Sequence, residues 1–170
     1  MVEMLVHRIG MNQQGHTLVI LADLQQVRLL PILIGEYEAY AIALALRGET
    51  FERPLTHDLF ANALQALGHR LTRVEVTKLE NGTFYGLLHL TTSTGSVTLD
   101  ARPSDAIALA LRTNARIFVA EQVLGEAQVW AADLEDDEND ELTQFRKIMG
   151  NMGLDADEPP ADVDEDEDDH

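Results

Sequence analysis

The chain has 170 residues, 45% of them hydrophobic, which is enough for one packed core and favours a single globular domain. It has no cysteine, which excludes disulfides, zinc–thiolate sites and a thiol nucleophile, and no run approaches the roughly 18 apolar residues of a membrane span. The net charge of −18 and a pI near 4.4 argue against a protein that coats DNA through many Lys and Arg contacts. The first residues do not have the pattern of a signal peptide, so we expect a cytoplasmic protein without a membrane partner.

The acidic residues are concentrated toward the C-terminus. Residues 1–130 contain 10 Lys and Arg and 13 Asp and Glu, whereas residues 131–170 contain 2 and 17. We therefore expect a folded domain over residues 1–130 and an acidic linker with a short helix over residues 131–154. A disordered acidic tail is expected over residues 155–170.

The first part of the domain predicts three strands and two helices. Apolar runs predict strands, in chain order, over residues 2–9, 17–22 and 27–34. Pro31 lacks an amide donor, so the third strand is expected at a sheet edge or with a bulge. A helix follows over residues 36–47 and ends at Gly48, the usual place for a left-handed cap. After a charged linker, a second helix is expected from its N-cap Thr56 to the stop at Gly68.

The second part of the domain is dominated by strands. Alternating residues predict strands over residues 70–79, 83–92, 96–101 and 116–120. Asn81 and Gly82 are typical of a tight hairpin turn between the first two. An alanine-rich helix is expected over residues 103–112, because Pro103 favours a helix start and Ser104 can cap it. A short helical turn is expected over residues 121–128.

The C-terminal segment contains one further helical pattern. Its apolar residues recur at helical spacing, namely Leu142, Phe145, Ile148 and Met149. Such a stripe docks either on the chain's own domain or on another protein. For residues 138–152 we therefore consider two interpretations, contact with the chain's own domain and contact with a protein partner.

The junction between the strand at residues 96–101 and the following helix concentrates charge. Asp100, Arg102 and Asp105 fall within six positions of one another. Strand-to-helix junctions are rigid on both sides and open at the tip, which suits binding and catalysis. The alternative is that these charges only cap the helix and pair with one another.

One heptapeptide occurs twice. Ala-Ile-Ala-Leu-Ala-Leu-Arg is found at residues 41–47 and again, identically, at residues 106–112, each time in a helix that follows a strand. The match is either a coincidence of low complexity or the trace of two similar βα units. Together the elements predict an α+β fold with a compact mixed, barrel-like sheet and helices packed outside, with an internal βα pseudo-repeat if the match is not a coincidence.

The charged residues at the helix starts form the candidate site. His57 is the one histidine in a polar cluster, since it stands beside Asp58 and close after Arg53. The candidate catalytic residues are Asp100, Asp105, His57, Asp58, Arg102 and Arg53. Carboxylates without cysteine suit Mg²⁺ or Mn²⁺, and the candidate ligands are Asp100, Asp105, Glu36 and Glu38.

Four segments resemble one known family in the right order. They begin with Leu30-Pro31-Ile32, Arg53-Pro54-Leu55-Thr56-His57-Asp58, Asn81-Gly82-Thr83-Phe84 and Asp100-Ala101-Arg102-Pro103-Ser104-Asp105. Residues 1–130 as a whole resemble the bifunctional nuclease domain family. The resemblance implies a compact mixed α/β domain, a homo-oligomer (dimer or trimer), and cleavage of both DNA and RNA.

Three hypotheses follow. The first is a nuclease that hydrolyses phosphodiester bonds of DNA and RNA with a divalent metal. The second is a non-catalytic oligomeric module for binding or regulation, in which the same residues cap helices and build an interface. The third adds that residues 131–170 imitate a nucleic acid and cover a basic groove around Arg53 and Arg102.

Overall fold

The computed structural model of the chain describes residues 1–12 and 14–130. Its strands are β1 (Val2–Met11), β2 (Thr17–Asp23), β3 (Arg28–Leu33), β4 (Arg70–Glu80), β5 (Thr83–Thr92), β6 (Gly95–Ala101), β7 (Arg116–Val119) and β8 (Val129–Trp130). Its helices are α1 (Glu36–Arg47), α2 (Thr56–Ala66), α3 (Pro103–Thr113) and α4 (Glu121–Ala127). The predictions for residues 131–154, 138–152 and 155–170 lie outside the described residues.

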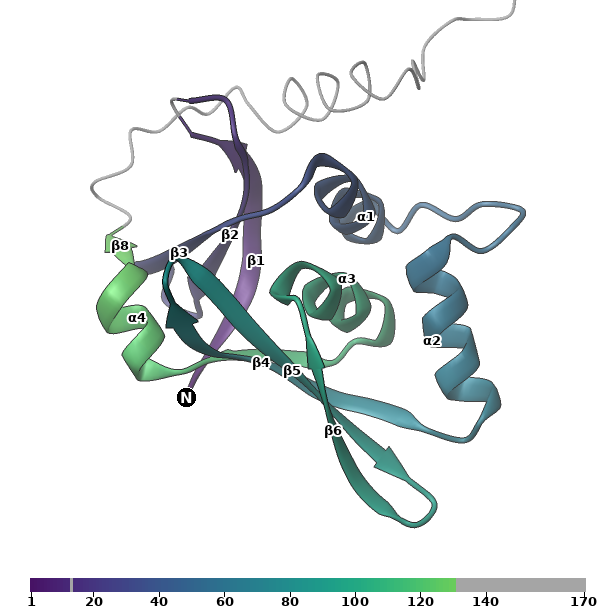
Figure 1. The fold of residues 1–170 in the computed structure, drawn as a ribbon. Helices are drawn as coiled ribbons and strands as arrows, with labels where there is room; N and C mark the ends of the chain where they lie inside the picture. Colours follow the sequence, from purple (N-terminus) through teal and green to yellow (C-terminus); the bar gives the residue numbers. More distant parts are fainter. Residues whose placement is uncertain (13, 131–170) are drawn as a thin grey trace, which may run out of the picture.

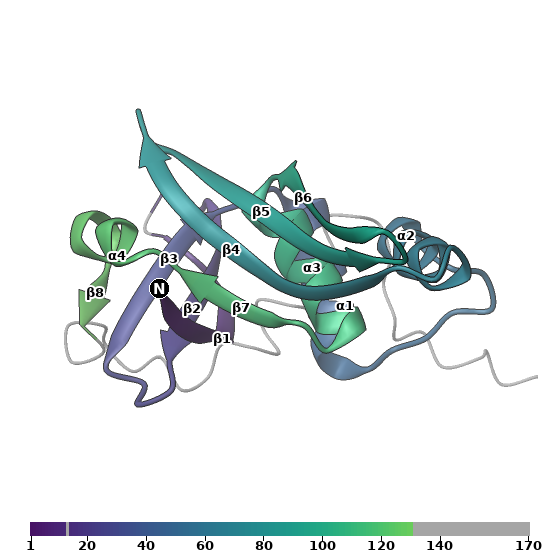
Figure 2. The ribbon, with the colours of Figure 1, turned by 90° about the horizontal axis from the view of Figure 1, so that it is seen from below.

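All the strands described belong to one mixed sheet, in the order β6-β5-β4-β7-β1-β2-β3-β8. β1 to β3 form one antiparallel meander and β4 to β6 form another. β7 joins the two meanders, because it pairs parallel to β4 and antiparallel to β1 (Figures 1 and 2). The predicted α+β fold with a mixed sheet is confirmed. The sheet is barrel-like only in its curvature, since β6 and β8 end the order without pairing to each other.

The topology contains the same unit twice. In the first half the β1–β3 meander leads into α1, and in the second half the β4–β6 meander leads into α3. The two copies of the heptapeptide, residues 41–47 and 106–112, occupy the C-terminal parts of α1 and α3. The predicted repeat therefore takes the form of a three-stranded meander followed by a helix.

The core lies between the sheet and helix α3. Ile107 and Ala108 of α3 are fully buried, together with Val74 and Val119 of the strands beneath. α1 and α2 both pack against α3 (Figure 1). This arrangement brings the N-terminal ends of three helices to neighbouring positions. None of the described helices is long and apolar enough to span a membrane.

Pro31 lies where the sequence predicted it. It is opposite Ile20 of β2, while the short β8 pairs only with Arg28 and Leu29 on the other side of β3. The missing amide of Pro31 therefore falls on a stretch of β3 whose outer edge makes no strand pair among the described residues.

The two predicted N-caps were wrong by one or two positions. α2 begins at Thr56 with Leu55 in the cap position, and α3 begins at Pro103 with Arg102 in the cap position. Because proline takes the first helical position, the cap must be the residue before it. Ser104 lies inside the helix and is only 6% exposed.

Candidate functional site

Each of the three neighbouring helices has an acidic residue at its third position. These residues are Glu38 in α1, Asp58 in α2 and Asp105 in α3. A carboxylate there lies near the free amide groups and the positive end of the helix dipole, which favours its charged form. The packing of α1 against α3 then brings Glu38 and Asp105 to the same guanidinium, that of Arg102, while Asp58 pairs with Arg112 of α3.

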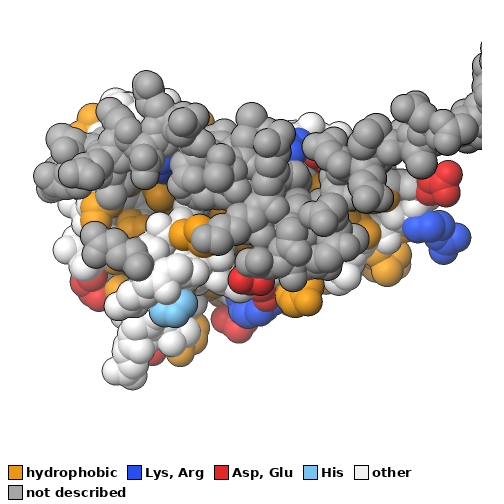
Figure 3. Space-filling model, turned by 90° about the horizontal axis from the view of Figure 1, so that it is seen from above, with side chains coloured by type: hydrophobic (Ala, Val, Ile, Leu, Met, Phe, Trp, Pro, Cys, Tyr) orange, Lys and Arg blue, Asp and Glu red, His pale blue; other side chains and the backbone are white. Residues whose placement is uncertain are grey.

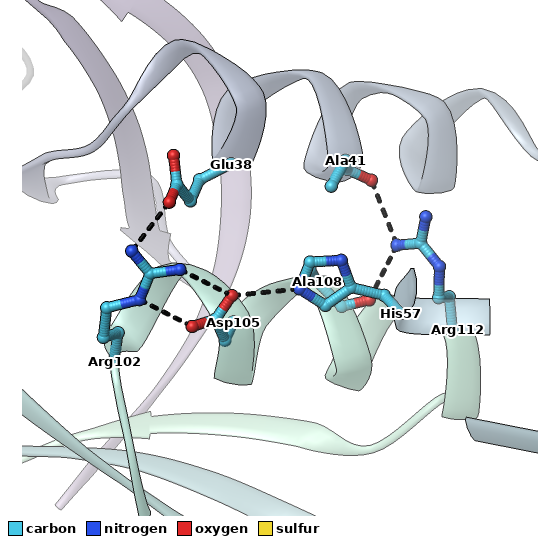
Figure 4. Close-up of polar contacts among 7 residues, drawn as sticks. All are labelled: Glu38, Ala41, His57, Arg102, Asp105, Ala108 and Arg112. Carbon is cyan, nitrogen blue, oxygen red and sulfur yellow. Dashed lines mark hydrogen bonds and ion pairs between the residues drawn. The ribbon is translucent and has the colours of Figure 1, made fainter. Parts of the chain in front are cut away.

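Three side chains from the helix starts and one N-cap form a continuous polar chain (Figure 4). Nη1 of Arg102 lies 2.7 Å from Oε1 of Glu38. Arg102 also donates to both oxygens of Asp105, from Nε at 2.7 Å and from Nη2 at 3.2 Å. On the far side, Nε2 of His57 lies 3.0 Å from Oδ1 of Asp105. Residues from α1, α2 and α3 are thereby joined in one cluster.

The cluster keeps its carboxylate and guanidinium ionised. Burial acts to raise the pKa of Asp105, but the hydrogen bonds from Arg102 and His57 outweigh it and lower that pKa below its ordinary value. The hydrogen bonds to Asp105 and Glu38 raise the pKa of Arg102. An ionised Asp105 can only accept hydrogen bonds, so Nε2 of His57 carries the proton that faces it. In the neutral ring the lone pair is therefore on Nδ1.

Arg112 builds a second contact between the same helices, and the sequence reasoning missed it. Its side chain is only 10% exposed and pairs through Nε with Oδ1 of Asp58. Its Nη1 donates to the carbonyl oxygens of Ala41 and Ala108, so the residue joins all three helices. The one available signal was that Arg ends both copies of the heptapeptide.

Asp58 has a structural role in this arrangement. Its carboxylate accepts the amide of Leu55 at 3.0 Å as well as the bond from Arg112. Burial acts to raise the pKa of Asp58, but these hydrogen bonds prevail and lower it. Asp58 thus holds the start of α2 against α3.

Two open hollows flank the His57–Asp105 pair. We call the first the α1–α2 hollow; it has a volume of about 590 Å³ and is lined by residues that include Tyr37, Tyr40, His57, Arg102, Asp105 and Arg112. We call the second the α2–β6 hollow; it has a volume of about 510 Å³ and is lined by residues that include His57, Phe60, Leu99, Asp100, Asp105 and Leu109. Because His57 and Asp105 line both, a ligand in either hollow can reach them.

The structure brings together only part of the predicted site. Glu38, His57, Arg102 and Asp105 are in direct contact, and Asp100 on β6 lines the α2–β6 hollow with two of them. Glu36 and Arg53 are exposed and line neither hollow. Glu36 is the first residue of α1, and Arg53 lies in the linker before α2.

The described residues do not form a divalent-metal site. No group of three or more His, Asp and Glu side chains among residues 1–12 and 14–130 is placed to hold an ion. Of the four predicted ligands, Asp105 has both oxygens bonded to Arg102, and Glu38 is paired with the same guanidinium. The donor set therefore does not fit Mg²⁺ or Mn²⁺ in this arrangement, and the metal stays a prediction.

Close packing at one glycine positions the cluster. Gly86 of β5 is opposite Ala101 of β6, beside the turn into α3. A Cβ at Gly86 would lie 2.9 Å from the carbonyl oxygen of Ala101 and 3.4 Å from the backbone of Pro103. The absence of a side chain at Gly86 thus allows the backbone that carries Arg102 to sit against β5.

Comparison with known proteins agrees with the resemblance of the motifs. Residues 19–132 match the sequence profile of the bifunctional nuclease domain. The chain belongs to the bifunctional nuclease domain family. It is 38% identical over 148 residues to an uncharacterized protein of Mycobacterium tuberculosis, covering 84% of this chain and 88% of that protein.

Rice proteins named as bifunctional nucleases are more distant. Bifunctional nuclease 1 of Oryza sativa subsp. japonica is 26% identical over 121 residues, covering 69% of this chain and 37% of that protein. Bifunctional nuclease 2 of the same subspecies is 31% identical over 94 residues, covering 54% of this chain and 29% of that protein. The match to the family profile, over residues 19–132, covers most of the described part of the chain.

Proposed function

We propose that this bifunctional nuclease domain hydrolyses phosphodiester bonds of DNA and RNA at the His57–Asp105–Arg102 cluster. The observation that carries the proposal is the bond between His57 and the ionised carboxylate of Asp105, which Arg102 also contacts. His57 and Asp105 line two open hollows. The family name and the rice proteins' names point to the same reaction class.

Each member of the cluster has a distinct role in the proposed reaction. Nδ1 of His57 forms no hydrogen bond with another described residue, so it can take a proton from water that attacks phosphorus. Asp105 orients the ring and stabilises the imidazolium that results. The new P–O bond forms as the bond to the leaving oxygen breaks, that oxygen takes a proton from solvent, and the imidazolium then returns its proton to solvent.

Arg102 is suited to contact the phosphate. A guanidinium has five N–H donors, and three of them bond Glu38 and Asp105 in this structure. The side chain is 65% exposed, so the remaining donors can reach a phosphate oxygen in the α1–α2 hollow. The two carboxylates hold the guanidinium in place before substrate arrives.

Asp100 and a divalent ion remain further proposals. The Asp100 carboxylate lines the same hollow as His57 and Asp105, which supports a role in positioning water there. A requirement for Mg²⁺ or Mn²⁺ would be seen as activity lost in EDTA and restored by the ion. A homo-oligomeric state and a partner for residues 138–152 also stay predictions, as does a tail that covers Arg53 and Arg102.

A second histidine–carboxylate pair provides a matched control. Nε2 of His89 lies 3.0 Å from Oε2 of Glu75 on β5 and β4, outside both hollows. Purified full-length chain is incubated with single-stranded DNA and with RNA, in Mg²⁺, in Mn²⁺ and in EDTA. We expect His57→Gln to reduce hydrolysis by about 10²–10⁴-fold and His89→Gln to leave it within about 3-fold. Equal activity of wild type and His57→Gln would refute the proposed role.

The second candidate function is a non-catalytic binding or regulatory module. It is favoured by the fact that Glu38 of α1 and Asp105 of α3 are both paired with Arg102, which ties the two helices together. On this reading, Asp105→Asn lowers the free energy of unfolding by about 1 kcal/mol or more, and purified wild type hydrolyses neither DNA nor RNA. Hydrolysis that disappears in a folded His57→Gln variant would exclude this candidate.

A further inference from the structure

Tyr37 has no role in the cluster described above, yet it is the most exposed large side chain with an apolar body among the described residues. It is 78% exposed, in the first turn of α1. It lines the α1–α2 hollow together with Arg102 and His57. Tyr40, three positions later and so on the same side of the helix, lines the same hollow.

We propose that Tyr37 is the stacking platform for the nucleobase next to the phosphate that Arg102 contacts. The inference rests on the proposed function, since it takes the α1–α2 hollow as the place where the strand binds. The hollow, at about 590 Å³, lies within the roughly 300–1,000 Å³ of small-ligand sites. An aromatic face beside a guanidinium is the combination that holds a base and its phosphate in single-strand binding.

The charge of the domain favours base stacking over phosphate contacts as the main source of affinity for a nucleic acid strand. Residues 1–130 contain only 10 Lys and Arg against 13 Asp and Glu. On the face shown in Figure 3, the Lys and Arg side chains that are visible are separated from one another and form no continuous patch. Since affinity from phosphate neutralisation grows with the number of cations in contact, it is small here. Base stacking contributes about 5- to 150-fold in affinity per base and needs no added cation.

The substrate class follows from the same geometry. In a duplex both faces of each base are covered by its neighbours, so a side chain reaches a base face only where the strand is unpaired. Tyr37 therefore selects single-stranded DNA or RNA. Stacking is tolerant of base identity, because every base has a π face.

The test is a cycle that combines a protein change with a base deletion. Binding of a fluorescent single-stranded oligothymidylate to the full chain is measured at low ionic strength, with variants Tyr37→Ala and Tyr37→Phe. Phe51→Ala is the control, because Phe51 is an exposed aromatic on the linker that lines neither hollow. A set of strands with one abasic site at each position in turn completes the cycle.

We expect Tyr37→Ala to weaken binding by about 5- to 150-fold, while Tyr37→Phe and Phe51→Ala stay within about 3-fold. When the abasic site replaces the base that stacks on Tyr37, wild type and Tyr37→Ala should bind the strand with equal affinity. The role of Tyr37 would be overturned if Tyr37→Ala bound as tightly as wild type, or if it lost the same affinity relative to wild type on every abasic strand. Either result would leave the proposed hydrolysis intact. A wild-type chain that neither binds nor cleaves the strands would overturn both.

Discussion

Replacement of Arg112 by Met should destabilise the domain, because this side chain joins three helices. Met keeps most of the buried aliphatic stem, so the change removes chiefly the charged contacts. The carbonyl groups of Ala41 and Ala108 lie inside α1 and α3 and keep their helical hydrogen bonds. The main loss is therefore the ion pair with Asp58.

The size of the loss follows from the burial of the pair. A hydrogen bond to a charged group contributes about 1.5–3 kcal/mol, and a fully buried broken pair costs more. The Asp58 side chain is 32% exposed, so water partly replaces Arg112 when it is removed. We expect a decrease of about 2 kcal/mol in the free energy of unfolding, which corresponds to a Tm lower by about 4–8 °C for a chain of this size.

The assay is urea unfolding followed by circular dichroism, with the slope of free energy against urea compared between variants. Arg116→Met is the control, since Arg116 is 68% exposed and 3.7 Å from Glu3, and such surface pairs contribute at most about 1 kcal/mol. The three-helix contact does not have the energetic role assigned to it if the free energy of unfolding of Arg112→Met lies within about 0.5 kcal/mol of the wild-type value. The same holds if Arg112→Met is destabilised no more than Arg116→Met.

Two further predictions use glycine packing and acid titration. Gly86→Ala should lower the free energy of unfolding by about 1–3 kcal/mol, because the added Cβ would meet backbone atoms. Gly125→Ala in α4, where nothing lies within 4 Å of an added Cβ, should raise it by about 0.5–1 kcal/mol. Urea unfolding measures both variants, and equal effects would contradict the packing argument. The folded state lowers the pKa of Asp58. Its contribution to the free energy of unfolding is therefore present above its ordinary pKa of 3.8 and is lost as the pH falls through the pKa in the folded state. The difference in unfolding free energy between wild type and Asp58→Asn should therefore be largest near neutral pH and should shrink below about pH 4; a difference that does not change with pH would refute the assignment.

Elements with local signals could be predicted from the order of residues alone. Gly48 and Gly82 adopt positive φ of 65° and 77°, as the helix stop and the hairpin turn required. Pro103 occupies the first position of α3, as its fixed φ predicts. These outcomes depend on backbone preferences of one or two residues, which a short stretch of sequence expresses without knowledge of the rest of the chain.

The pairing of charged groups depends instead on how the helices pack in three dimensions. Arg102 contacts Glu38, 64 positions earlier, and Arg112 contacts Asp58, 54 positions earlier, because α1 and α2 both pack against α3. Glu36 has the same charge as Glu38 and lies two positions away, yet it lies outside the site. Side-chain partners are set by helix packing over long sequence separations, and residue type at one position carries no information about that geometry.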